Sequence, residues 1–106
     1  MDQDAKILLG DLEEINTLLQ KENWTQIQEQ FTVFGQKWEK EAFWWSMIIS
    51  HDEIDKVNLL ISEMNALLQS DSLPEAKLDM AQNLNELIFW VDHIAGKGNL
   101  TSPNFL

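Results

Sequence analysis

The sequence contains no cysteine, arginine or tyrosine, and only four glycines and two prolines in 106 residues. Without cysteine the chain can form neither a disulfide framework nor a thiolate metal site. The longest apolar stretch, residues 42–49, is interrupted by Ser46 and is far shorter than the roughly 20 residues that cross a bilayer. A chain of this length suits one domain. We therefore expect a single domain with no membrane span.

Positive charge is also scarce. Eighteen aspartates and glutamates face seven lysines, which gives a net charge of −11 at pH 7. Nucleic-acid binding depends on cations that meet phosphates, so this composition argues against a nucleic-acid partner. An anionic membrane surface would also repel the chain. Cations, basic proteins or simple solubility remain as explanations of the acidity, and a well-solvated surface is the plainest of them.

Apolar residues recur at alternating steps of three and four, which is the period of amphipathic helices. Four helices are predicted, with stripes made of Ala5, Leu8, Leu12, Ile15 and Leu19; of Trp24, Ile27, Phe31, Phe34, Trp38, Ala42, Trp45 and Ile48; of Ile54, Val57, Ile61, Met64 and Leu68; and of Leu73, Ala76, Met80, Leu84, Leu87, Val91 and Ile94. Helix starts are predicted from Asn23 as an N-cap and from capping boxes at residues 50–53 and 72–75. Gly96 is predicted to end the last helix.

The predicted fold is all-α, with four antiparallel helices in a left-handed up-down bundle or in two stacked helical hairpins. Residues 14–20 resemble residues 63–69 at an offset of 49, which indicates a pseudo-repeat of two hairpins. Chance similarity between amphipathic helices is the alternative. We expect a four-helix domain over residues 1–95 and a flexible C-terminal tail over residues 96–106, which contain Gly, Asn, Ser and Pro.

Several motifs resemble those of a family of small bacterial helical proteins that is defined as a domain of unknown function and occurs largely in spore-forming Gram-positive species. The motifs are Asn23-Trp24, the Trp-Glu-Lys segment at 38–40, the aromatic run at 43–45, the His-x-Glu-Ile-Asp helix start at 51–55 and the late Asp-His-Ile at 92–94. The resemblance covers about residues 8–95. It implies a helical fold and supplies no reaction.

Members of that family usually begin with a hydrophobic anchor or leader, from which this sequence departs. With such an anchor the domain would lie on the outer face of the bacterial cytoplasmic membrane or be secreted. The resemblance therefore implies an extracytoplasmic location if an N-terminal anchor has been removed from this chain, and the sequence itself leaves the location open.

Aromatic residues gather where the second, third and fourth predicted helices meet at one end of a bundle. Some lie off the core stripes, and these are the candidate partner-binding residues: Phe43, Trp44, Met47, Phe89 and Trp90. A helix that is apolar on nearly all sides is buried or is matched to a partner. Two explanations stay open, a wide core built from two aromatic helix ends and a surface patch for a partner helix or a hydrophobic ligand.

Two histidines are expected near the same end, because antiparallel pairing of the last two helices brings His51 toward His93. With nearby carboxylates they form a weak candidate metal set: His51, His93, Asp52, Asp55 and Asp92. Imidazoles with a carboxylate bind Zn²⁺, and histidines also act as pH switches. However, no helix carries a His-x-x-x-His or Glu-x-x-His spacing. The simpler explanation is that both histidines are helix-end residues, with His93 suited to a helix C-terminus and Asp52 and Glu53 suited to a helix N-terminus.

The sequence shows no nucleophile elbow, phosphate-binding glycine loop or cofactor motif. We therefore expect no enzyme and no cofactor. The predicted function is a non-enzymatic helical interaction domain whose partner is another protein or a second copy of the chain. The alternative is a small metal-binding or pH-sensing protein that uses His51 and His93.

Overall fold

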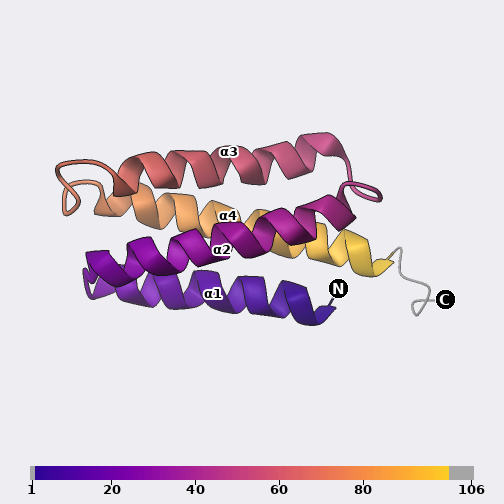
Figure 1. The fold of residues 1–106 in the computed structure, drawn as a ribbon, viewed down its shortest axis with the longest axis horizontal. Coiled ribbons are helices and arrows are strands. Elements are labelled where there is room, and N and C mark those ends of the chain that lie inside the picture. Colours follow the sequence, from indigo (N-terminus) through magenta and orange to yellow (C-terminus); the bar gives the residue numbers. More distant parts are fainter. Residues whose placement is uncertain (1, 101–106) are drawn as a thin grey trace.

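The computed structural model describes residues 2–100 as four α-helices joined by short connections (Figure 1). They are α1 (Asp2–Gln20), α2 (Trp24–Trp45), α3 (His51–Leu68) and α4 (Lys77–Leu100). Each helix runs antiparallel to the one before it, as connections of a few residues favour. No strand occurs in this part of the chain. The predicted all-α fold of four antiparallel helices is confirmed.

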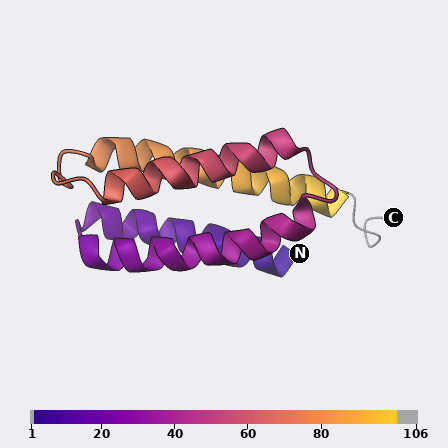
Figure 2. The ribbon, with the colours of Figure 1, turned by 45° about the horizontal axis from the view of Figure 1, so that its top comes forward.

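The helices occupy the four corners of a bundle. α1 packs along both α2 and α4, α3 packs along α4, and α2 and α3 touch at fewer points. Figure 2 shows the two hairpins, α1–α2 and α3–α4, as two pairs that lie one above the other. It follows that α2 and α4 stand at diagonal corners, and this arrangement decides which side chains can share a surface.

The core is formed mainly by the apolar residues of the predicted stripes, which face the interior of the bundle. Every predicted position of α1 is buried, and so are the large side chains at the centre of α2, among them Phe31, Phe34 and Trp38. Full burial of a large apolar side chain stabilises the fold by about 1.5–3 kcal/mol, so the stripes supply most of the driving force. One predicted core residue is wrong. Ile48 is 45% exposed and Ile49 is buried instead, because α2 ends at Trp45 and the following turn shifts the periodicity.

The pseudo-repeat also appears in the burial pattern. Leu8, Ile15 and Leu19 of α1 are buried, and so are the residues of α3 that lie 49 positions later, namely Val57, Met64 and Leu68. Both segments therefore present the same stripe to the shared core.

The connection between α1 and α2 is a tight helix stop. The Asn23 backbone N–H donates to the Leu18 carbonyl at 3.1 Å, and the Glu22 N–H donates to Leu19 at 3.0 Å. These two bonds form a Schellman motif, which requires a left-handed residue where glycine is usual. Glu22 adopts that conformation, with φ of 54°. Asn23 is the N-cap of α2 as predicted, although its side chain makes no capping hydrogen bond.

Neither predicted capping box forms as a reciprocal pair. Ser50 caps α3 by accepting from the Asp52 N–H at 3.2 Å, whereas the carboxylate of Glu53 turns to α4 instead of back to Ser50. Before α4, the backbone makes a turn in which Glu75 and Ala76 donate to the Ser72 carbonyl, and the helix itself begins at Lys77. The capping-box patterns therefore predicted where the helices begin, but they did not predict which groups form the hydrogen bonds there.

The predicted end of the last helix at Gly96 is wrong. α4 continues through Gly96 to Leu100, and no described glycine has a positive φ. A glycine with helical torsions costs stability relative to alanine but does not stop a helix that neighbours support. Residues 101–106 of the predicted tail lie outside the described residues, and the division at residue 95 stays a prediction.

Candidate functional site

One end of the bundle gathers most of the candidate residues. The end of α2, the beginning of α3, the second half of α4 and the first turns of α1 all lie there, at the right of Figure 1. The antiparallel order of the helices is the cause, so this part of the sequence prediction holds. The exposure of each side chain then separates core residues from surface residues.

Four apolar side chains at the end of α2 are exposed to solvent. The exposed fractions are 61% for Phe43, 60% for Trp44, 65% for Met47 and 45% for Ile48. We call these four residues the α2 aromatic surface. Trp45, in the middle of this run, is completely buried. These four side chains therefore lie on the surface, whereas Trp45 belongs to the core.

The turn after α2 produces this surface. The Ser46 hydroxyl donates to the Phe43 carbonyl at 2.7 Å, and the Ile49 N–H donates to the Trp45 carbonyl at 2.7 Å. Ile49 is thereby turned inward while the residues before it remain outside. The rings of Phe43 and Trp44 meet edge to face, with centroids 5.4 Å apart, which is a favourable geometry for two aromatic rings.

A second group of rings lies on α4. Phe89 is 61% exposed, whereas Trp90 is partly buried and packs against the core. The imidazole of His93 stacks on the Phe89 ring at 6.1 Å and meets the Trp90 ring edge-on at 5.7 Å. Trp90 therefore contributes mainly to the fold, and Phe89 is the residue of this group that offers contact area.

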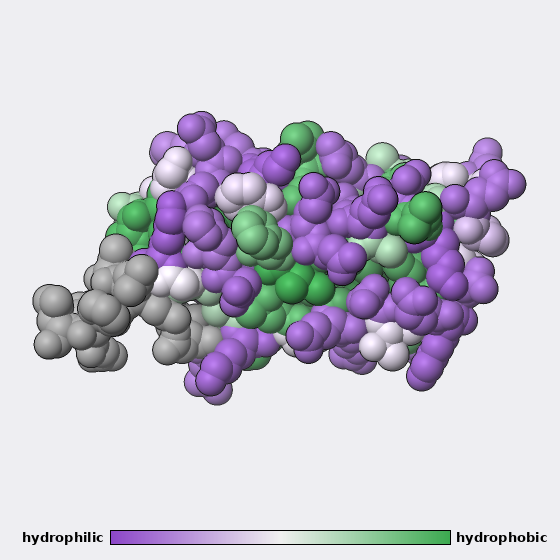
Figure 3. Space-filling view, turned by 180° about the vertical axis from the view of Figure 1, so that it is seen from behind, coloured by the Kyte–Doolittle hydropathy of each residue, from purple (hydrophilic) through white to green (hydrophobic). Residues whose placement is uncertain are grey.

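The two groups do not form one patch. Phe43 and Trp44 lie on the outside of α2 and Phe89 lies on the outside of α4, and these helices stand at diagonal corners of the bundle. Figure 3 shows the face that is hidden in Figure 1 as mostly hydrophilic, with hydrophobic side chains near its middle. Of the described aromatic side chains that are more than half exposed, Phe43 and Trp44 lie on α2 and Phe89 lies on α4.

Three polar side chains, those of Glu53, His93 and Lys97, connect α3 to α4 at the same end. Oε1 of Glu53 accepts a hydrogen bond from Lys97 Nζ at 2.6 Å and from His93 Nε2 at 3.0 Å. The Lys97 hydrogen bond is the main reason that the pKa of Glu53 is lowered, and His93 adds to it. The other carboxylate oxygen, Oε2, is buried without a hydrogen-bond partner. This cluster fixes how the beginning of α3 sits on α4.

The predicted metal set separates in the structure. His93 belongs to the Glu53 cluster, while His51 is the exposed first residue of α3. Asp52, Asp55 and Asp92 are exposed as well. Within residues 2–100, no three histidine or acidic side chains lie close enough to hold a metal ion. No arrangement of ligands in the described structure therefore favours the metal hypothesis.

Sequence reasoning missed the polar contacts beneath the surface. Trp38 Nε1 donates to Asn58 Oδ1 at 2.8 Å, which satisfies a buried indole at the seam between α2 and α3. Lys97 was not considered, because the helix was expected to end before it.

Within the described residues, no helix is long and apolar enough to cross a membrane.

Comparison with known proteins gives a family and no activity. A family model described as "Domain of unknown function (DUF4363)" matches residues 1–104, nearly the whole chain. Searches of curated proteins and of solved structures each found no match.

Proposed function

The chain belongs to the DUF4363 family, and from that premise we propose that it is a non-enzymatic interaction domain that binds another protein through the α2 aromatic surface. The observation that carries the proposal is the exposure of Phe43, Trp44 and Met47, each at 60% or more, directly beside the buried Trp45. The partner that fits is an apolar surface, such as the exposed stripe of a helix.

Exposed side chains of this kind are what protein interfaces use. Isolated exposed apolar residues are common on any protein, whereas a contiguous group marks a contact site. Aromatic residues and methionine are enriched at the centres of interfaces, and truncation of such anchors often costs 2 kcal/mol or more of binding free energy. Phe43, Trp44 and Met47 are all of these types, and the rings of Phe43 and Trp44 contact each other edge to face.

The charge of the chain supports a protein as the partner. With a net charge of −11, the chain would be repelled by nucleic acids and by anionic lipid surfaces. The α2 aromatic surface presents hydrophobic area, and the neighbouring Ser46 hydroxyl is engaged with the Phe43 carbonyl. This surface therefore suits binding to another protein better than catalysis.

We also propose that the domain works outside the bacterial cytoplasmic membrane, on the basis of its resemblance to a family whose members usually begin with a hydrophobic anchor or leader. An extracellular protease applied to intact cells tests this location. Cleavage without cell lysis is expected, and protection until lysis would contradict it.

Capture of the partner tests the interaction. A photo-crosslinker placed at Met47 should trap a protein of the native cell, and the double variant Phe43→Ala, Trp44→Ala should trap at least about tenfold less, since two anchors of this size contribute more than the 1.4 kcal/mol that a factor of ten requires. The matched control is Leu78→Ala, which removes a side chain that is 70% exposed at the other end of the bundle.

Two outcomes would reject the proposal. One is equal capture by a double variant whose thermal unfolding matches the wild type. The other is a stable dimer of the wild-type chain that the double variant breaks, because a second copy would then be the occupant of this surface.

A further inference from the structure

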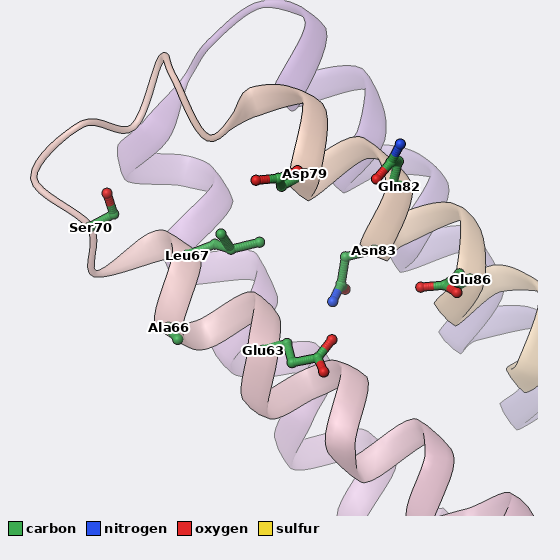
Figure 4. A pocket seen from close by; sticks show the side chains of 8 residues that line it. All are labelled: Glu63, Ala66, Leu67, Ser70, Asp79, Gln82, Asn83 and Glu86. Atoms are coloured by element: carbon green, nitrogen blue, oxygen red, sulfur yellow. The ribbon is translucent and has the colours of Figure 1, made fainter.

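A groove lies far from the aromatic end, between the second half of α3 and the first half of α4. It holds about 480 Å³, within the range of small-molecule sites. Figure 4 shows its walls: Glu63, Ala66 and Leu67 come from α3, and Asp79, Asn83 and Glu86 come from α4. No function described above uses this groove.

One buried group in the groove has an unmet hydrogen bond. Asn83 is only 5% exposed, and its Nδ2 donates to the Leu60 carbonyl at 2.9 Å. Because a carbonyl can only accept, this bond fixes the orientation of the amide and leaves Oδ1 as a buried acceptor without a partner. Such groups are uncommon in folded proteins and cost free energy. Figure 4 shows the Asn83 side chain extending from α4 toward Glu63 on α3, at the bottom of the groove. A donor that reaches Oδ1 from the groove would supply the missing hydrogen bond.

The charges of the groove indicate what kind of donor fits. Glu63, Asp79 and Glu86 are all acidic, and no lysine lines the groove. Asp79 and Glu86 are seven residues apart on α4, about 10 Å along the helix axis at 1.5 Å per residue. In the described part of the chain no three such groups converge closely enough to hold one metal ion. Separated carboxylates suit separated positive charges better than a single ion.

Apolar surface lies between these charges. Ala66 and Leu67 line the same groove. A ligand that alternates ammonium groups with short runs of methylenes matches both features, because its nitrogens reach the carboxylates and its methylenes cover Leu67.

We propose that the α3–α4 groove binds a linear aliphatic polyamine. Ammonium groups pair with Glu63 and with the carboxylates of α4, and one N–H donates to Asn83 Oδ1. This site is separate from the α2 aromatic surface, so the proposed binding of a polyamine does not depend on the proposed function.

Titration with spermidine at low ionic strength, followed by amide NMR shifts, tests the assignment. The expected shifts concentrate at residues 63–70 and 79–86. The double variant Glu63→Gln, Glu86→Gln should bind about tenfold more weakly, because it removes two of the three carboxylates that the groove offers to the ammonium groups. The matched control is Glu13→Gln, Glu22→Gln, which makes the same change of charge at exposed positions outside the groove and should stay within about twofold of the wild type.

A third variant tests the buried acceptor. Asn83→Leu removes Oδ1 and keeps every carboxylate, and it should weaken spermidine binding in a protein whose circular dichroism and melting remain native-like. Unchanged binding by this folded variant would overturn the assignment. So would shifts spread over all acidic faces, an equal loss of affinity in the control, displacement of spermidine by an equal concentration of Mg²⁺, or tighter binding of a lysine-rich peptide than of spermidine.

Discussion

Glu53 in the first turn of α3 accepts a hydrogen bond at 3.0 Å from His93 on α4, forty positions later in the chain. Lys97, one helical turn beyond His93, donates to the same oxygen at 2.6 Å. His93 in turn stacks on Phe89 and meets the edge of Trp90. One carboxylate therefore connects the α3 N-terminus to the aromatic rings of α4, at the end of the bundle that carries the proposed interaction surface.

The pKa of Glu53 predicts a loss of stability in acid. Lys97 and His93 lower the folded-state pKa below the ordinary value of 4.5, so the ionised carboxylate stabilises the fold above pH 4.5. That contribution disappears as the pH falls through the lowered folded-state pKa. Urea unfolding should show Glu53→Gln less stable than the wild type at pH 7, with the difference shrinking as the pH falls below 4.5 and through the lowered folded-state pKa. A constant difference across that range would show that the charge of Glu53 is not the cause.

Glu41 should behave in the opposite way. Partial burial and the neighbouring carboxylate of Asp4 raise the pKa of Glu41 above 4.5. A raised folded-state pKa favours the fold below pH 4.5, and this contribution is lost as the pH rises through the folded-state value. Glu41→Gln should therefore stabilise the protein at pH 7 and have little effect near pH 3. As a check on the cause, Asp4→Asn should lower the pKa of Glu41 measured by carboxyl NMR.

Asn58 should matter more than its exposed position indicates. Its Oδ1 accepts the hydrogen bond of the Trp38 indole, which is 1% exposed. Asn58→Ala leaves the indole N–H buried without a partner, at an expected cost of about 1–3 kcal/mol in the free energy of unfolding. Asn58→Asp keeps an acceptor and should recover most of the loss. Equal destabilisation by the two variants would argue against the hydrogen bond as the cause.

The interior of the bundle could be predicted from the sequence because burial follows a simple period. Leu8, Ile15 and Leu19 recur at helical spacing, and so do their counterparts in α3, so the pattern alone identifies the buried faces. The prediction failed at Ile48 because a turn after Trp45 shifts the period, and no residue type marks that shift.

The polar contacts could not be predicted in the same way. A capping box is a local pattern, and it assigned Glu53 to Ser50, whereas the partners in the structure are forty and forty-four residues away. The Trp38–Asn58 bond joins two helices whose relative rotation the sequence does not give. The division of the aromatic residues into two surfaces has the same origin, because only the packing of the helices places α2 and α4 at diagonal corners.

Adjacent tryptophans should respond very differently to truncation. Trp45 is completely buried and packs on Trp38 with ring centroids 5.8 Å apart, whereas Trp44 is 60% exposed. Trp45→Ala should cost about 3–5 kcal/mol, as large core truncations do. Trp44→Ala should change stability by no more than about 0.5 kcal/mol, as a surface substitution does. Chemical denaturation measures both, and a large loss at Trp44 would mean that partner-capture defects at this residue reflect unfolding.

Glycine in place of Glu22 should stabilise the protein. Glu22 has a φ of 54° in the Schellman motif that ends α1, and a side chain in that left-handed conformation costs roughly 1–2 kcal/mol. Glycine avoids this cost but loses more conformational entropy on folding, so the expected net gain is about 0.5–1 kcal/mol. Two variants separate the causes. Glu22→Ala keeps a Cβ at the strained position and should give no comparable gain, and Glu13→Gly, in the regular part of α1, should destabilise by about 1 kcal/mol. If Glu22→Gly lowers the melting temperature as much as Glu13→Gly does, the left-handed conformation of Glu22 does not destabilise the protein.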